Sequence, residues 1–214
     1  MAKLRIAVLF GLGAILCCAT AATADEISEF WRWFEANSSS YHALNFENTE
    51  RRDELFADLG ERLEKIDENI AFEFGKLDND LMDFVISASG IVETFPVVKK
   101  LVDAAPQIPN WKFTAFRQRK DEVVTIEMGG INIDRNTTLA KLYKDDGKIG
   151  IVLFLPGYEE TPNQTFEQIG FLLLDQTLGE YVVGTQVGFV EFEKKSDAIE
   201  GAMRLSDIVE FFEL

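Results

Sequence analysis

The spacing of apolar residues follows the same sequence of patterns twice along this chain, and this repetition restricts the fold more than any other feature of the sequence. Two alternating runs joined by a turn are followed by a helical run and a further alternating run, over residues 71–117 and again over residues 139–192. Alternation predicts strands, whereas apolar residues three and four positions apart predict a helix. We therefore expect an α+β fold, with helices packed on a mixed, largely antiparallel sheet.

Each copy of this pattern is a predicted hairpin, helix and strand. The first copy comprises strands at residues 71–75, 82–88 and 111–117 and a helix at residues 91–105. The second comprises strands at residues 139–143, 149–155 and 181–192 and a helix at residues 163–178. Asp146-Gly147 lies between the first two strands of the second copy, and Asp-Gly is a strong hairpin signal. The copies share no residue-level pattern, so the predicted duplication is one of topology.

Two helices are predicted before the first copy and one after the second. The first covers residues 25–36, and the Asn-Ser-Ser-Ser run at residues 37–40 is expected to end it. The second covers residues 49–69, with apolar residues on one side and charged residues on the other. The last covers residues 206–212, with Ser206 as its cap.

The first 24 residues have the organisation of a secretory signal peptide. Lys3 and Arg5 precede an apolar run, and small residues follow it up to Ala24. We expect cleavage after Ala24, export to the periplasm or the medium, and a single α+β domain over residues 25–214. An uncleaved membrane anchor is the alternative to cleavage, and after cleavage no membrane attachment is expected.

The chain lacks the residues that familiar catalytic and metal sites require. His42 is its only histidine, and both cysteines, Cys17 and Cys18, fall within the predicted signal peptide, where lipidation is a further alternative. A zinc site needs several Cys or His ligands, and a Ser-His-Asp triad needs a histidine beside its nucleophile. No phosphate-binding glycine-rich motif is present after the signal peptide. We therefore predict no catalytic residue, no metal site and no cofactor.

The chain is strongly acidic. It carries 37 Asp and Glu residues against 21 Lys and Arg residues, and loss of Lys3 and Arg5 with the signal peptide takes the net charge from −16 to near −18. Such a surface repels nucleic acid and anionic lipid. It suits a basic protein as partner, and the alternative is that the charge serves only to keep an exported protein soluble. The oligomeric state does not follow from the sequence.

One group of polar residues is expected to converge at a sheet edge. If the strands at residues 82–88 and 111–117 are parallel, their carboxyl ends lie together, beside the start of the intervening helix. Ser87, Ser89 and Gly90 follow the first strand, and Arg117 and Arg119 end the second. Hydroxyls, a helix N-terminus and guanidinium groups suit a small anion. The alternative is a helix cap beside ordinary surface charge.

Several short motifs occur together along the chain: FWRWFEAN near the predicted mature start, then FEFG, ISASG, LVDAAPQIPNWKFTAFRQR and LLLDQTLGEY. In this order the chain resembles an uncharacterised family of bacterial proteins with a Phe-Trp-x-Trp-Phe start and an Ala-Pro…Trp…Ala-Phe core. The resemblance covers most of the predicted mature chain. It implies a shared fold, and it brings no activity and no catalytic residues.

These observations favour an exported acidic binding module that does no chemistry. The alternative is a hydrolase that uses carboxylates, with or without a bound metal. Its candidate residues are Glu159-Glu160, Asp175 and Glu180. Asp175 interrupts an apolar helical run, so its carboxylate needs a partner or a route to water. A carrier of small anions is the third hypothesis.

Overall fold

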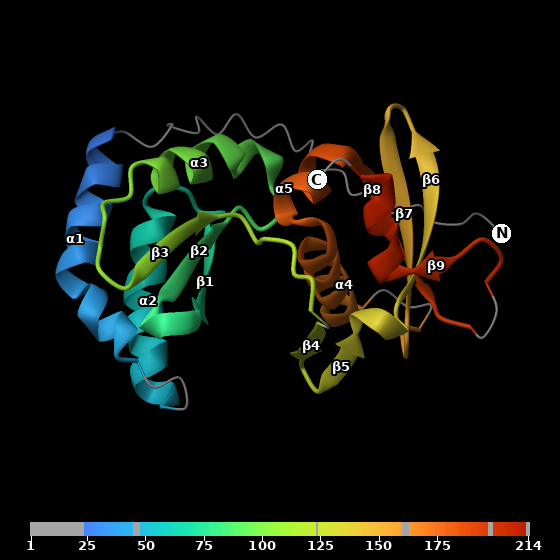
Figure 1. Ribbon diagram of the computed structural model, residues 1–214, viewed down its shortest axis with the longest axis horizontal. Coiled ribbons are helices and arrows are strands. Elements are labelled where there is room, and N and C mark those ends of the chain that lie inside the picture. Colours follow the sequence, from blue (N-terminus) through green and yellow to red (C-terminus); the bar gives the residue numbers. More distant parts are fainter. Residues whose placement is uncertain (1–23, 45–47, 123, 160–162, 197–198, 213–214) are drawn as a thin grey trace. The chain divides into compact units, whose positions relative to one another are not determined.

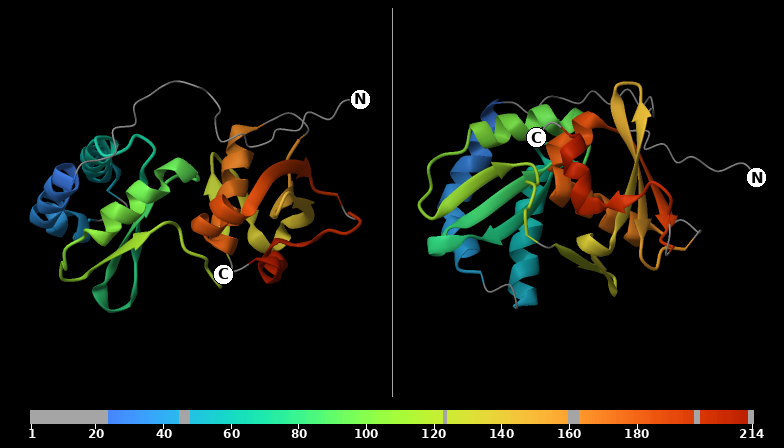
Figure 2. Two further views of the ribbon diagram at one scale, coloured as in Figure 1. Left: turned by 90° about the horizontal axis from the view of Figure 1, so that it is seen from above. Right: turned by 45° about the vertical axis from the view of Figure 1, so that its right-hand side comes forward.

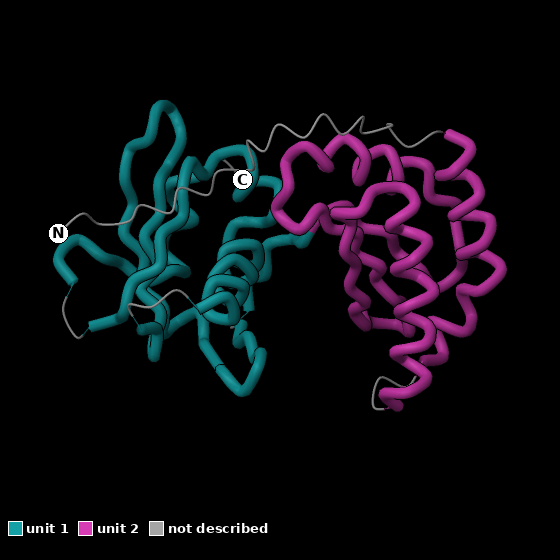
Figure 3. Tube along the Cα trace, turned by 180° about the vertical axis from the view of Figure 1, so that it is seen from behind, with its two compact units in different colours: residues 1–13, 117–214 teal, residues 14–116 magenta. Residues whose placement is uncertain are grey.

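The computed structural model describes residues 24–44, 48–122, 124–159, 163–196 and 199–212 (Figure 1). The predicted signal peptide lies outside these ranges apart from Ala24. The fold is α+β, with two helices at its N-terminal end and mixed, largely antiparallel sheets, as predicted. The chain divides into two compact units at the bond between Phe116 and Arg117 (Figure 3). The expectation of one domain stays a prediction, because compactness alone does not decide whether the units fold cooperatively.

The sheet of the N-terminal unit has three strands in the order β1-β2-β3. The central strand β2 (Met82–Ser87) pairs antiparallel with β1 (Ala71–Lys76) and parallel with β3 (Trp111–Ala115). Helix α3 (Phe95–Asp103) connects the two parallel strands. The predicted hairpin, helix and strand of the first copy are therefore confirmed.

The larger sheet of the C-terminal unit repeats this arrangement. Its strand β7 (Lys148–Leu155) pairs antiparallel with β6 (Leu139–Asp145) and parallel with β8 (Val187–Lys194). Helix α4 (Gln164–Leu178) lies in the connection between β7 and β8. The topological duplication predicted from the sequence is thus present in the pairing of the strands.

Further elements complete the C-terminal unit. Strand β9 (Met203–Arg204) pairs with β6 at the edge of the four-stranded sheet, while β4 (Thr125–Met128) and β5 (Ile131–Asp134) form a separate hairpin. Gly129 and Gly130 form the turn of this hairpin, and both have positive φ, which glycine adopts readily.

Aromatic side chains build the core of the N-terminal unit. Helices α1 (Ala24–His42) and α2 (Thr49–Glu64) cover one face of its sheet, as can be followed in Figure 2. The Trp31 ring of α1 lies 4.7 Å from that of Phe113 in β3, and its Nε1 donates to the Leu101 carbonyl of α3 at 2.8 Å. Helices α1 and α3 therefore pack on the same face of the sheet.

The core of the C-terminal unit is mainly aliphatic. On β7 the fully buried side chains of Ile151, Leu153 and Leu155 point to one face. That face packs against α4 through Leu173 and Leu174, and Figure 1 shows α4 and α5 (Glu180–Gln186) on one side of the sheet. In each unit the helices therefore cover one face of the sheet. The central strand of each sheet pairs antiparallel with the preceding strand and parallel with the following one.

The first helix does not end at the serine run as predicted. It continues to His42, because polar side chains of the run bond to carbonyls inside the helix: Asn37 Nδ2 to Trp33 at 2.8 Å and Ser38 Oγ to Glu35 at 3.0 Å. Tyr41 at its end is buried, and its hydroxyl donates to the Leu55 carbonyl of α2 at 3.0 Å. Tertiary packing thus extends a helix that local propensity would stop.

The predicted strand over residues 181–192 is wrong in its first half. Residues Glu180–Gln186 form α5, and the strand begins only at Val187. Helix α4 ends at Leu178, where the predicted helix also ends, and Gly179 follows it with φ 89°. The Gly179 carbonyl accepts from Val183 N at 3.0 Å, which closes the first turn of α5. The β-branched residues here favour a strand, and the fixed position of Glu180 overrides that preference.

Smaller corrections concern where elements end. Helix α2 ends at Glu64 rather than near residue 69, and α3 begins at Phe95 after a short 3-10 helix, Val92–Thr94. The predicted closing helix is a 3-10 helix, Leu205–Phe211. Ser206 does not cap it, since its hydroxyl donates to Asp207 at 2.9 Å.

Candidate functional site

Ser87, Ser89 and Gly90 form a tight turn after β2. Ser87 is fully buried, and its Oγ accepts a hydrogen bond from Ser89 N at 2.9 Å. Ser89 and Gly90 have φ values of 53° and 78°, in the left-handed region that favours glycine. Thr94, which precedes α3, makes no side-chain cap bond. The two serines are brought together by the turn, and they do not cap the helix.

Arg117 and Arg119 lie outside the strand to which the sequence assigned them. Strand β3 ends at Ala115, and Phe116 has φ 65°, which breaks the alternation expected to place both arginines on one strand face. Arg119 pairs with Asp121 at 2.8 Å on the surface. A small-anion site that includes both arginines stays a prediction, and their guanidinium groups already hold carboxylates.

Arg117 belongs to a buried ion cluster with Asp175 and Glu180. Its Nη1 lies 3.3 Å from Asp175 Oδ2 and 3.9 Å from Glu180 Oε2, and the three side chains are 13%, 8% and 0% exposed. Two hydrogen bonds from the backbone link the same residues: Arg117 N donates to Glu180 Oε2 at 3.0 Å, and Glu180 N donates to the Arg117 carbonyl at 2.9 Å. The cluster thus fastens the segment after Phe116 to the junction of α4 and α5.

This cluster explains the carboxylate in the apolar run of α4. Asp175 needs a partner in the protein interior, and Arg117, 58 residues earlier in the chain, supplies it. Asp175 and Glu180 are also the residues that the hydrolase hypothesis would use. Both carboxylates converge on one guanidinium, and the backbone of Gly179 packs close to Arg117 and Arg119. The arrangement suits a structural role better than proton transfer.

Arg135 is a buried residue that sequence reasoning missed. Its Nη1 donates to the Lys120 carbonyl at 2.7 Å and its Nη2 to the Glu122 carbonyl at 2.6 Å. A longer bond reaches the Gln176 carbonyl of α4 at 3.3 Å. Backbone carbonyls carry no sequence signature, so only the folded chain reveals that Arg135 fixes the loop at residues 120–122 against α4.

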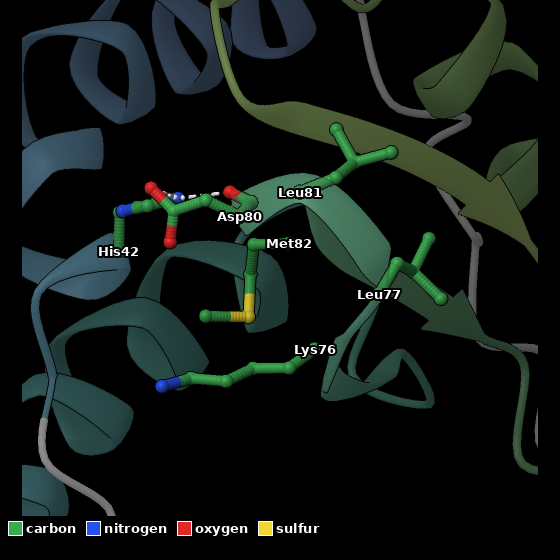
Figure 4. Close-up of a pocket in the computed structure, with 6 residues that line it drawn as sticks. All are labelled: His42, Lys76, Leu77, Asp80, Leu81 and Met82. Carbon is green, nitrogen blue, oxygen red and sulfur yellow. Dashed lines mark hydrogen bonds and ion pairs between the residues drawn. The ribbon is translucent and has the colours of Figure 1, made fainter.

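The N-terminal unit contains a small pocket beside the turn between β1 and β2, about 30 Å³ in volume (Figure 4). It is lined by His42, Lys76, Leu77, Asp80, Leu81 and Met82. His42 Nε2 lies 2.9 Å from the Asp80 carbonyl and 3.9 Å from its carboxylate. Pockets for organic ligands usually measure about 300–1,000 Å³, so this one suits only water or a small ion. His42 therefore anchors the turn.

Among the described residues, no three His, Cys, Asp or Glu side chains gather in a way that would bind a metal ion. Within the same ranges, each helix is too short or too polar to cross a bilayer.

No protein-family model, curated protein or solved structure matches the chain. The resemblance to an uncharacterised bacterial family therefore stays a prediction.

The surface charge is the remaining candidate for recognition. Many basic side chains are already paired with carboxylates of their own unit, as in Arg51–Glu54, Arg52–Asp53, Arg62–Asp58, Lys112–Asp83 and Lys194–Glu159. On α2 the exposed carboxylates of Glu50, Glu61 and Glu64 lie beyond such pairs. Each such pair joins one carboxylate to one cation, so the acidic surplus of the sequence remains after pairing.

Proposed function

We propose that the protein is an exported acidic binding module that recognises a basic protein and performs no chemistry of its own. The observation that carries the proposal is the surplus of carboxylates, 37 Asp and Glu against 21 Lys and Arg, with exposed members such as Glu50, Glu61 and Glu64 on α2. A field of one sign accelerates the encounter with a partner of the opposite sign and disfavours partners of like sign.

The buried carboxylates support the same conclusion. A carboxylate pair for acid–base chemistry has to reach a substrate, and Asp175 and Glu180 are instead held by Arg117 inside the C-terminal unit. Exposed carboxylates in high dielectric add little to stability, so their number is better explained by solubility and recognition than by folding.

The proposal is tested by capture from the export compartment, with residues 25–214 as bait at low salt. We expect a stoichiometric basic protein that is released as the ionic strength rises, because salt screens exposed charges. Two variants locate the contact: Glu50→Gln, Glu61→Gln and Glu64→Gln combined on α2, against Glu122→Gln, Glu127→Gln and Glu210→Gln combined in the C-terminal unit.

The two triple variants remove equal charge, so a difference between their association rates identifies the unit that docks. An equal, modest loss of rate in both would indicate steering by the whole acidic surface. Failure to capture a basic protein, together with hydrolytic turnover that Asp175→Asn abolishes, would contradict the proposal.

A further inference from the structure

The four-stranded sheet of the C-terminal unit has a second face, which lies outside the core described above. Because strands alternate, the neighbours of Ile151 and Leu153 along β7 point away from α4. We call this surface the open face; its central residues are Lys141 and Tyr143 of β6, Gly150 and Val152 of β7, and Phe189 and Glu191 of β8. These residues lie outside the core that packs on α4, α5 and the final 3-10 helix.

The strand register arranges the open face in two rows across the sheet. Val152 pairs with Lys141 on one side and with Glu191 on the other, which makes the first row. Gly150 pairs with Tyr143 on one side and with Phe189 on the other, which makes the second row. Each row thus has different groups at its two ends: a cation opposite a carboxylate, and a tyrosine opposite a phenylalanine.

The glycine in the second row is required by the aromatic rings beside it. A Cβ at position 150 would clash with the Phe189 ring, which lies over the backbone. The rings of Tyr143 and Phe189 are 6.3 Å apart, and Tyr143 is 42% exposed. Lys141 Nζ lies 5.8 Å from the Tyr143 ring. The row therefore presents two neighbouring aromatic rings, with the Phe189 ring lying over Gly150.

We propose that the open face binds the open face of a second copy of this chain. A two-fold axis that runs along β7, between two sheets packed face to face, reverses the order of each row. It places Lys141 of one copy opposite Glu191 of the second copy, and Tyr143 opposite Phe189. A two-fold axis across the strands would instead place like charges together. The charged row therefore selects the axis along β7, and the aromatic row is compatible with the isologous interface that this axis gives.

This geometry agrees with the known packing of β-sheets. Two sheets packed face to face keep their strands within about 30° of each other, and an axis close to the strand direction gives that aligned arrangement. Aromatic pairs and opposite charges across the interface are favourable.

The dimer is expected to be weak. From strand spacing and rise, the open face measures about 20 Å by 25 Å, or roughly 500 Å² per copy, against about 800 Å² per partner in a standard interface. Val152 is already only 5% exposed, so Tyr143 and Phe189 supply most of the apolar area that dimerisation would bury. The charged pairs make the association sensitive to salt.

Sedimentation equilibrium of residues 25–214 up to about 1 mM tests the proposal, at low and at high salt. We expect a monomer–dimer equilibrium at high salt, where the repulsion between two copies that each carry a net charge near −18 is screened. Lys141→Glu and Glu191→Lys should each weaken the dimer by at least about tenfold, since the symmetry breaks two pairs at once. The double variant restores opposite charges in both positions and should return to within about threefold of the parent.

Lys65→Glu is the control, because it makes the same charge change in the N-terminal unit and should leave the dimer unaffected. Circular dichroism and melting of each variant establish that the fold is retained. A monomer at every concentration would overturn the proposal and would leave the open face to a different partner. The proposal would equally be overturned if the single variants left the dissociation constant of the dimer unchanged, or if the double variant did not restore it.

Discussion

The two units have the same order of strands and opposite kinds of core. At the centre of β2, Phe84 is fully buried among rings, with Phe34 and Phe74 both 4.9 Å away. At the corresponding place on β7, Leu153 is equally buried among aliphatic side chains. A tight hairpin followed by a helical crossover thus determines the topology, and quite different side chains can fill the space between sheet and helices.

The units also differ in how their polar groups are used. The crossover helix α4 begins at an asparagine cap, and its C-terminal end is fastened by the buried ion cluster. The crossover helix α3 begins without a side-chain cap bond and is held by the aromatic core through Trp31. The crossover helix of the N-terminal unit is therefore held through the aromatic core, and that of the C-terminal unit through a cap and a buried ion cluster.

All three tryptophans, Trp31, Trp33 and Trp111, lie in the N-terminal unit. Tryptophan emission therefore reports the unfolding of that unit, while amide hydrogen exchange in β7 and α4 reports the other. These two signals allow each substitution below to be assigned to one unit.

The largest effect is expected from Phe84→Ala. Removal of a ring that fills the centre of the aromatic core should lower the free energy of unfolding by about 4–5 kcal/mol, because a cavity remains. Denaturant unfolding followed by tryptophan emission measures it. Leu153→Ala is the matched change in the other core, and its effect should appear in amide exchange of β7. Equal effects of Phe84→Ala and Phe84→Leu would contradict the cavity argument.

The second effect tests the buried ion cluster. Arg117→Met leaves two buried carboxylates without their cation and should lower the free energy of unfolding by about 3–4 kcal/mol. Arg119→Met removes an exposed pair and should change it by less than about 1 kcal/mol.

A triple variant sharpens this test. Arg117→Met combined with Asp175→Asn and Glu180→Gln leaves no uncompensated charge, so it should recover part of the loss. Amide exchange at the junction of α4 and α5 is the measurement. A triple variant less stable than Arg117→Met would show that the charges are not the cause.

The third effect depends on pH. Burial raises the pKa of Tyr41 to about 12, and the nearby Asp58 adds to the shift. A raised pKa means that the unfolded chain loses this proton first, so stability is intact below pH 10 and falls as the pH rises through 12. The parent should lose up to about 3 kcal/mol more than Tyr41→Phe over that interval. Denaturant titrations across the interval, followed by tryptophan emission, provide the comparison.

The smallest effect concerns the start of α4. Asn163 Oδ1 accepts from Thr165 N at 3.1 Å and from Phe166 N at 3.4 Å. Asn163→Ala should cost about 1 kcal/mol and should raise amide exchange in the first turn of α4. Asn163→Asp is the control, because an aspartate caps equally well. Unchanged exchange in the alanine variant would show that the cap is not needed.

Sequence signals predicted the turns and helix ends that depend only on residues close together in the chain. Asp146 and Gly147 have φ values of 42° and 85°, as the hairpin signal requires, and Gly179 ends α4 with a positive φ. The start of α5 escaped prediction because it depends on Glu180, whose position is fixed by Arg117, 63 residues earlier in the chain. Similarly, the need of Asp175 for a partner was evident, but the identity of that partner was not.

The central claim is that each unit is held together by a core of its own. Expression of residues 25–116 alone tests this most directly, with tryptophan emission followed through a denaturant titration. We expect the fragment to show the buried-tryptophan emission of the full chain and a cooperative unfolding transition. Emission typical of solvent-exposed tryptophan, with no cooperative transition, would contradict the claim.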